Sequence, residues 1–294
     1  MSSLAKYEVE NCFNHLKLYS DGSAFCKDPI HYDTPFIGDS RVIYKDIVFN
    51  EEHNLSLRVY KPTTTKSSTS SSKKLPVLFH FHGGGFCFGF QTTLTNHNMC
   101  VHMEKMLEAV VIEPDHRLAP EYRLPAAIDD ACDTLRWLQS QVRSSNNKDD
   151  TLLDGADFDR DFMLGYSSGG NLAHHLAVWF KADSANLTPI RLRGYMLLSP
   201  FFGGTVQTKS EKERPSEGFW TVSKYDKARA LQSGSGCGSK IMRVRVNDYA
   251  TKLQKLGKRI EYVELKGETH PLSAAAKNVI QITKRFMIMY CNSN

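Results

Sequence analysis

The sequence has no apolar run long enough to cross a membrane. No stretch of its 294 residues approaches the roughly eighteen consecutive apolar residues that a transmembrane helix needs. The first residues, MSSLAKYEVENCF, also lack the long apolar core of a secretory signal peptide. We therefore expect no membrane partner and a cytoplasmic protein, with the nucleus as an alternative second location.

Cysteine pairs and charge runs are also missing. The seven cysteines are an odd number without repeating spacing, and no C-x-x-C pair occurs, so we expect reduced thiols, no metal and no cofactor. The net charge of +5 comes from 37 basic and 32 acidic residues that are interspersed along the chain. The main basic run, Lys73-Lys74, ends a serine–threonine tract and has no interleaved aromatic residues. A solvated loop explains it better than a nucleic-acid groove, so we expect no nucleic-acid partner.

What the chain does have is 41% hydrophobic residues, arranged as alternating strand and helix patterns. This alternation predicts an α/β fold with a mostly parallel central sheet and helices on both faces, in a single domain over 1–294. Within it we expect an N-terminal lid segment at 1–40, a mobile loop at 63–74 (TTTKSSTSSSKK) and an abbreviated cap region at 203–238. The patterns predict strands at 42–49, 55–60, 75–81, 109–112, 161–164, 193–198 and 259–265, and helices at 8–18, 98–107, 126–142, 171–181, 245–256 and 273–290.

Two glycine-rich motifs carry the chemistry. Gly165-Tyr166-Ser167-Ser168-Gly169 follows a short apolar strand and precedes a helical pattern, which places Ser167 on a sharp turn at the positive end of a helix. A chance glycine–serine turn is the alternative. Gly83-Gly84-Gly85 follows the strand at 75–81, and three glycines permit close backbone approach to a ligand with free N–H groups. Such groups are what a developing oxyanion requires.

Together with Asp115-His116-Arg117-Leu118-Ala119-Pro120-Glu121 and Leu124-Pro125-Ala126-Ala127, these motifs resemble the plant carboxylesterases of the hormone-sensitive-lipase-like α/β-hydrolases. The resemblance implies an α/β-hydrolase fold with a shortened cap, with Ser167 as nucleophile and His270 as base. It also implies an oxyanion hole formed by the N–H groups of Gly83, Gly84, Gly85 and Ser168. His80, His82, His116, His174 and His175 also lie near motifs, but only His270 follows the last predicted strand, where the family places its base.

The acid of the triad departs from this family. Lys240 stands where the family's G-x-x-D-x-[LM]-R pattern has its aspartate, and the apolar strand expected just before it is missing. Neither Asp248 nor Glu268 is a convincing substitute by its spacing. Tyr166 also replaces the usual aspartate of the elbow, a position that tolerates many residues.

These features favour a serine hydrolase that acts on carboxylic esters of small metabolites and is impaired by Lys240. A lyase or cyclase with His270 as general base, and a non-catalytic binder of a small plant metabolite, remain alternatives, because the family includes an isoflavanone dehydratase and a gibberellin receptor. The sequence identifies neither the substrate nor the oligomeric state.

Overall fold

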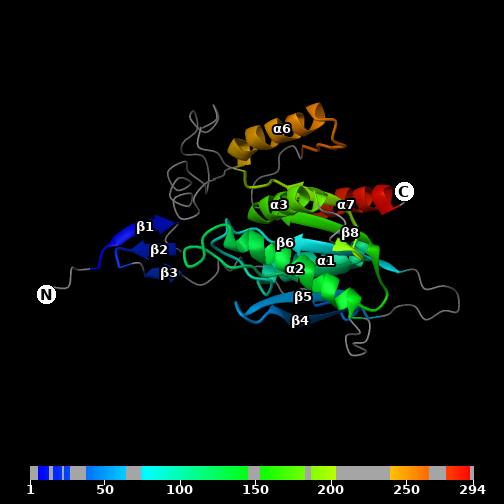
Figure 1. Ribbon diagram of the computed structural model, residues 1–294, viewed down its shortest axis with the longest axis horizontal. Coiled ribbons are helices and arrows are strands. Elements are labelled where there is room, and N and C mark those ends of the chain that lie inside the picture. The colour runs from blue at the N-terminus through cyan, green and yellow to red at the C-terminus, as the bar shows by residue number, and fades with distance from the viewer. Residues whose placement is uncertain are drawn as a thin grey trace.

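A six-stranded mixed sheet forms the centre of the protein in the computed structural model (Figure 1). The structure describes residues 6–12, 16–21, 23–26, 38–63, 74–144, 153–182, 187–202, 239–264 and 276–291. The strand order is β4-β5-β7-β6-β8-β9. Strands β7, β6, β8 and β9 are parallel to one another, and β5 is antiparallel to both of its neighbours, β4 and β7. The bounds are β4 Val42–Asn50, β5 Leu55–Pro62, β6 Leu75–Phe81, β7 Val110–Pro114, β8 Ala156–Tyr166 and β9 Leu192–Leu198.

Helices cover both faces of this sheet because successive residues of each central strand face opposite sides. On β6, Phe79 belongs to a core with Leu135 and Leu172 from two helices, whereas the adjacent Leu78 belongs to a second core with Met103. The first core lies under α2 (Ala126–Arg143) and α3 (Ser168–Ala182), and the second lies under α1 (Leu94–Leu107) and α7 (Ala276–Cys291). The predicted fold class is confirmed.

The N-terminal segment differs from its prediction. The helix expected at 8–18 is wrong, because β1 (Glu8–Cys12), β2 (Leu16–Tyr19) and β3 (Ala24–Cys26) form a small antiparallel sheet. A turn between β2 and β3 stabilises this arrangement. The N–H of Ser23 donates to Asp21 Oδ1 (2.9 Å), and the N–H of Tyr19 donates to the Ser23 carbonyl (2.9 Å). Pairing across this turn supplies the hydrogen bonds that a helix would have supplied within one segment.

The strand predicted at 259–265 is also absent over its described part. Residues 258–264 have neither helix nor strand structure, and Tyr262 and Val263 are exposed. A strand needs a hydrogen-bonding neighbour, and the sequence lacks the apolar strand that would have stood beside it. Residues 64–73 of the loop predicted at 63–74, the cap region predicted at 203–238 and residue 265 lie outside the described residues.

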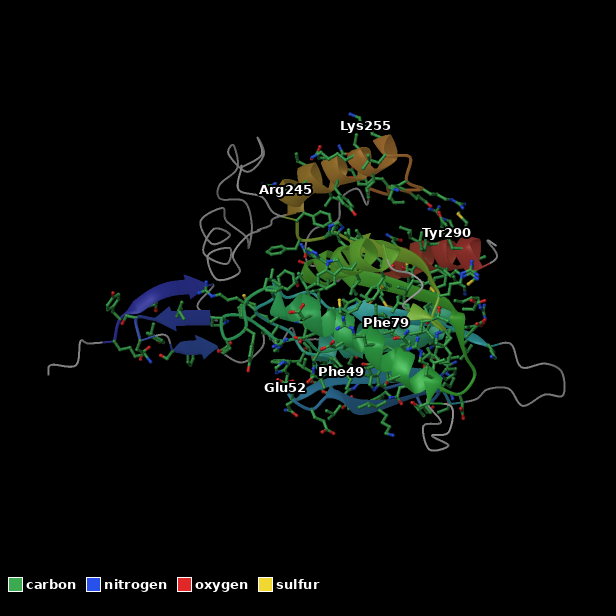
Figure 2. All side chains as sticks on the ribbon, viewed as in Figure 1. Phe49, Glu52, Phe79, Arg245, Lys255 and Tyr290 are labelled. Atoms are coloured by element: carbon green, nitrogen blue, oxygen red, sulfur yellow. The ribbon has the colours of Figure 1, made fainter. Side chains whose placement is uncertain are left out.

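The remaining predicted helices are confirmed, with shifted ends. The helix expected from Asn98 begins four residues earlier, at Leu94, and the helix expected from Arg245 is α6 (Ser239–Lys255). Figure 2 shows Phe79 within the layered body and Arg245 and Lys255 on α6. Helix α6 lies on the far side of α3 from the central sheet. Among the described residues, no helix is long and apolar enough to span a membrane.

Candidate active site

Ser167 occupies the turn between β8 and α3, as predicted. Its φ is +55°, a strained value for a residue with a side chain, and its side chain is nearly buried, with 4% exposed. Backbone hydrogen bonds hold this conformation: the Ser167 N–H donates to the Leu198 carbonyl (3.0 Å), and the Ser167 carbonyl accepts from Phe201 (2.8 Å) and Asn171 (3.2 Å). The residue is therefore fixed between the ends of β8 and β9 and the first turn of α3.

The glycines of this turn are required by the close approach of backbone segments. A Cβ at Gly165 would stand 2.1 Å from the Gly169 carbonyl oxygen, and a Cβ at Gly169 would stand 1.9 Å from the Phe81 carbonyl oxygen. No side chain fits at such distances. The glycines thus bring the N-terminus of α3 against the end of β6, where the glycine loop starts.

The loop Gly83–Gly85 is a tight turn beside the elbow. Gly84 has φ +136°, and a Cβ there would lie 1.8 Å from the Phe88 carbonyl oxygen, while a Cβ at Gly83 would lie 2.9 Å from the Tyr166 ring. No described residue accepts a hydrogen bond from the N–H groups of these three glycines. The N–H of Ser168, the first residue of α3, has no acceptor within the helix. Unpaired N–H groups next to Ser167 are suited to binding an anionic oxygen.

A stacked pair of imidazoles supports the glycine loop. His82 Nδ1 lies 2.8 Å from the Gly83 carbonyl oxygen, which can only accept, so this nitrogen carries the proton. The His116 ring stacks on His82 with centroids 4.7 Å apart, and burial, followed by the nearby His82, lowers the pKa of His116 to about 3. His116 is therefore neutral at physiological pH. The sequence singled out both residues within motifs but gave no sign that their rings would meet.

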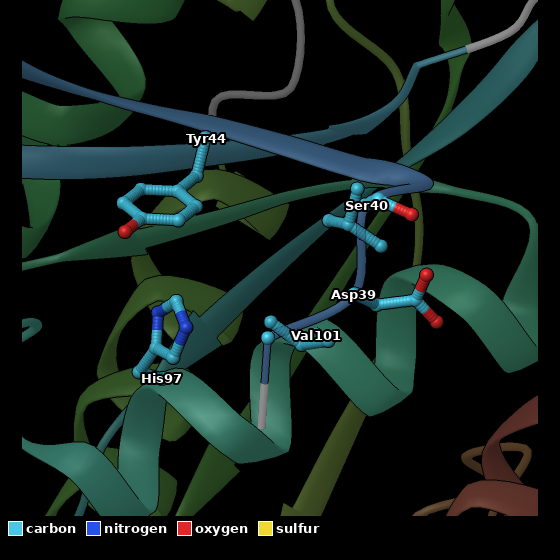
Figure 3. A pocket seen from close by; sticks show the side chains of 7 residues that line it. Asp39, Ser40, Tyr44, His97 and Val101 are labelled. Atoms are coloured by element: carbon cyan, nitrogen blue, oxygen red, sulfur yellow. The ribbon is translucent and has the colours of Figure 1, made fainter. Parts of the chain in front are cut away.

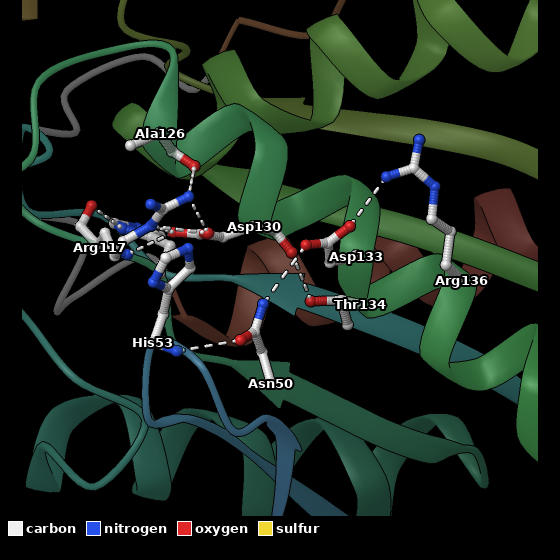
Figure 4. Close-up of polar contacts among 9 residues, drawn as sticks. Asn50, His53, Arg117, Ala126, Asp130, Asp133, Thr134 and Arg136 are labelled. Carbon is white, nitrogen blue, oxygen red and sulfur yellow. Dashed lines mark hydrogen bonds and ion pairs between the residues drawn. The ribbon is translucent and has the colours of Figure 1, made fainter.

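The motif that contains His116 is tied to α2 by a buried ion pair (Figure 4). Asp130 is fully buried and accepts hydrogen bonds from the Arg117 backbone N–H (2.7 Å) and the Arg117 Nε (2.9 Å). The N–H of Ala119 in the same motif donates to the Phe86 carbonyl at the end of the glycine loop (2.8 Å). The Asp115–Glu121 motif therefore connects α2 to the glycine loop.

The structure describes only some of the residues considered as base or acid. His270 and Glu268 lie outside the described residues, and Lys240 lies in the first turn of α6 with its side chain undescribed. Asp248 is exposed and pairs with Lys252 one helical turn later (2.7 Å), which is a surface ion pair. The Asp248 carboxylate is therefore already paired with a lysine on the surface of α6.

Two of the histidines near the motifs, His174 and His175, are half-buried on α3. His174 Nδ1 lies 2.8 Å from the Tyr249 hydroxyl, and burial lowers the pKa of His174 to about 4. Its ring also meets Phe202 edge-on, so these contacts hold α6 against α3. Burial also lowers the pKa of His175.

A cavity of about 250 Å³ lies between α1 and the β4 edge of the sheet (Figure 3). No residue of the elbow or of the glycine loop lines it. Its lining residues are Gly38, Asp39, Ser40, Val42, Tyr44, His97 and Val101.

Comparison with known proteins shows which families the chain is similar to. Residues 78–236 match the family described as alpha/beta hydrolase fold, and residues 5–121 match the family described as carboxylesterase. A 3-O-acetylpapaveroxine carboxylesterase of Papaver somniferum is 40% identical over 168 residues, which are 57% of this chain and 53% of that protein. The chain thus spans about half the length of this relative.

Longer matches extend over most of the chain. Carboxylesterase 20 of Arabidopsis thaliana is 31% identical over 249 residues, which cover 83% of this chain and 74% of that protein. The solved structure of an esterase from Pyrobaculum calidifontis superposes with a TM-score of 0.66 over 89% of this chain and 88% of that one, at 21% identity. This structural likeness shows the fold.

Proposed function

The chain belongs to the plant carboxylesterase family of α/β hydrolases, and we propose that it is a serine esterase for carboxylic esters of small metabolites. The observation that carries this proposal is the geometry at Ser167. The serine is held at positive φ at the start of α3, beside a glycine loop whose N–H groups have no described acceptor. A nucleophile and an oxyanion hole are the two elements that acyl transfer requires.

In the proposed reaction, Ser167 Oγ attacks the ester carbonyl carbon while His270 accepts the hydroxyl proton. The resulting oxyanion binds the N–H groups of Gly83, Gly84, Gly85 and Ser168. The C–O bond of the ester then breaks, and the alcohol leaves with the proton from His270. Water attacks the acyl-enzyme with His270 again as base, and the carboxylic acid is released as Ser167 regains its proton.

The identity of the acid is part of the proposal. With Lys240 at the family's acid position, a cation near His270 disfavours the imidazolium that acyl transfer needs, so we propose an esterase of reduced turnover. Acetyl esters of small plant metabolites are the proposed substrates, because the Papaver relatives are named for the ester 3-O-acetylpapaveroxine.

A fluorophosphonate probe followed by peptide mass spectrometry tests the nucleophile, and hydrolysis of p-nitrophenyl acetate tests the activity. We expect one adduct, on Ser167, and a loss of at least about 10³-fold in turnover for Ser167→Ala. Ser199→Ala is the matched control, since Ser199 also has positive φ (+42°) and follows a strand, and it should keep both labelling and turnover. An adduct on Ser199 or Ser168, or an unlabelled and inactive wild type, would overturn the proposal.

A further inference from the structure

Three side chains with metal-binding atoms meet in the core under α1, on the side of the sheet away from α2 and α3. His80 comes from β6, Glu113 from β7 and Cys100 from α1, and all three are buried. His80 Nδ1 lies 3.4 Å from Glu113 Oε1 and 3.5 Å from Cys100 Sγ, and Cys100 Sγ lies 2.8 Å from Glu113 Oε2. One ligand atom from each residue lies within 4.8 Å of the other two.

These separations suit a tetrahedral ion. Zn²⁺ with bonds of about 2.0–2.2 Å to nitrogen and oxygen and about 2.3 Å to sulfur separates its ligand atoms by roughly 3.3–3.6 Å. The two distances from His80 Nδ1 fall in this range. The shorter contact, from Cys100 Sγ to Glu113 Oε2, is a hydrogen bond that the thiol donates and that a bound metal would replace.

The buried carboxylate of Glu113 also favours a bound cation. Glu113 is fully buried, and its Oε1 makes no hydrogen bond with any described residue although the atom points at His80. The guanidinium of Arg58 contacts Asp46 through two nitrogens, at 2.6 and 2.7 Å, and is therefore engaged elsewhere. Buried carboxylates are paired with charges or coordinate metals, because an uncompensated charge in an apolar core is costly.

We propose that His80, Cys100 and Glu113 bind a borderline-soft divalent cation, with Zn²⁺ as the best fit. A thiolate and an imidazole select such an ion over Mg²⁺ or Ca²⁺, which prefer oxygen ligands. Binding removes the thiol proton of Cys100 to solvent and leaves a metal–thiolate bond. The ion joins α1 to β6 and β7 and leaves one coordination position for water.

The cavity beside α1 adjoins the helix that carries Cys100. His97 and Val101 line the cavity and lie on the same helix as Cys100, one turn before and one residue after it. His97 in turn contacts Arg58 (3.3 Å) and the Tyr60 hydroxyl (3.2 Å) through Nδ1. A polar group of Arg58, Tyr60 and His97 therefore lies beside the cavity.

Titration of the reduced full-length protein with Co²⁺ tests the site, because a cobalt–thiolate bond gives a charge-transfer band in the near ultraviolet. We expect a band that saturates at one equivalent and that Zn²⁺ abolishes. Cys100→Ser should remove the band, whereas Cys132→Ser, which changes another buried free thiol, should retain it. Glu113→Gln keeps the side-chain volume and should weaken Co²⁺ binding by at least about tenfold.

Circular dichroism first checks that each variant is folded. If Cys100→Ser does not fold, the Co²⁺ affinity of Glu113→Gln decides whether the site exists. A wild type without a stoichiometric band, or a band that persists in folded Cys100→Ser, overturns the proposal. The measurement is independent of esterase activity, so a failure here and a failure at Ser167 are separate results.

Discussion

Asp161 on β8 is a fully buried carboxyl group, and neither of its oxygens makes a hydrogen bond of good geometry with a described residue. Burial raises the pKa of Asp161 well above its usual value, and the charges of Asp157 and Asp159 act in the same direction, while the Arg191 backbone opposes them. The folded protein therefore binds the Asp161 proton more tightly than the unfolded chain does. Stability that is fully present below about pH 4, the unfolded value, is lost as the pH rises through the folded pKa.

We predict that Asp161→Asn stabilises the protein at pH 8 and flattens this pH dependence. The amide stays neutral where the carboxyl group must ionise, and each unit by which the folded pKa exceeds the unfolded one corresponds to about 1.4 kcal/mol at high pH. Urea denaturation at pH 5 and pH 8 measures the difference. Asp159→Asn is the control: that carboxylate is exposed near Arg193, and its loss should change stability by less than about 0.5 kcal/mol. Equal pH dependence in wild type and Asp161→Asn would refute the prediction.

At the scale of single residues, motif reading correctly predicted the strand-to-helix turn at Ser167, because the glycines that mark it lie within a few residues of the serine. The positive φ of Ser167 and the close approach of Gly165 to Gly169 lie within a turn of five residues, whereas the contacts of this turn with Phe81, Leu198 and Phe201 come from distant segments. The cluster of His80, Cys100 and Glu113 escaped the same reading. Its members are separated by at least thirteen residues, and only the parallel register of β6 with β7 and the docking of α1 bring them together.

Among the elements, the glycine loop between β6 and α1 depends on its backbone conformation. We predict that Gly84→Ala lowers esterase turnover by at least about 10²-fold, since a Cβ 1.8 Å from the Phe88 carbonyl oxygen forces the loop and its N–H donors to move. Gly155→Ala is the matched control, because Gly155 also has positive φ (+81°) but open space around its Cα. That control should cost about 1–2 kcal/mol in stability and leave turnover unchanged. Equal turnover in the two variants would show that the loop does not supply the oxyanion hole.

The tether from α2 to the Asp115–Glu121 motif gives a second prediction for an element. Asp130→Asn should destabilise the protein by about 3 kcal/mol or more, because it removes the charge that compensates the Arg117 guanidinium at a buried position. Asp133→Asn on the same helix removes an ion pair with Arg136 that is largely exposed, and should cost less than about 1 kcal/mol. Thermal unfolding followed by circular dichroism compares the two. A smaller loss for Asp130 than for Asp133 would contradict the assigned role.

The elements predicted wrongly share one physical cause. The pattern at 8–18 suits a helix locally, yet the turn at Asp21 and Ser23 allows strands to pair. The pattern at 259–265 suits a strand, yet no described neighbour pairs with residues 259–264. Strands depend on partners that are distant in sequence, so periodicity alone cannot decide them. Helix α2, whose hydrogen bonds are local, was predicted to within one residue, and the other confirmed helices have shifted ends.

For the molecule as a whole, the alternation of strands and helices was sufficient to predict the layered architecture. Parallel strands joined through helices place their carboxyl ends on one edge, and both glycine motifs follow such ends, at Phe81 and Tyr166. The side of the site that should hold the base and acid was less predictable. His270 lies outside the described residues, and the sequence departs from the family pattern at Lys240.

That departure leads to a prediction for the complete site. We expect Lys240→Asp to raise kcat/KM for short acyl esters by at least about tenfold, against a ceiling of about 10⁴ set by the usual effect of a triad acid. A carboxylate there would orient His270 and stabilise its imidazolium, whereas lysine disfavours that cation. The change also suits the first turn of α6, which has no acidic residue and where the helix dipole favours a negative charge.

Lys240→Gln separates the two contributions, because it removes the positive charge without adding a carboxylate. We expect Lys240→Gln to gain less than Lys240→Asp, and Asp248→Asn to leave kcat/KM unchanged, since Asp248 is exposed and paired with Lys252. A wild type that is already fast and insensitive to Lys240→Asp would mean that another carboxylate acts on His270. Loss of that activity in Glu268→Gln alone would identify Glu268. Equal gains in Lys240→Asp and Lys240→Gln would instead mean that the lysine charge, and not a missing acid, limits the enzyme.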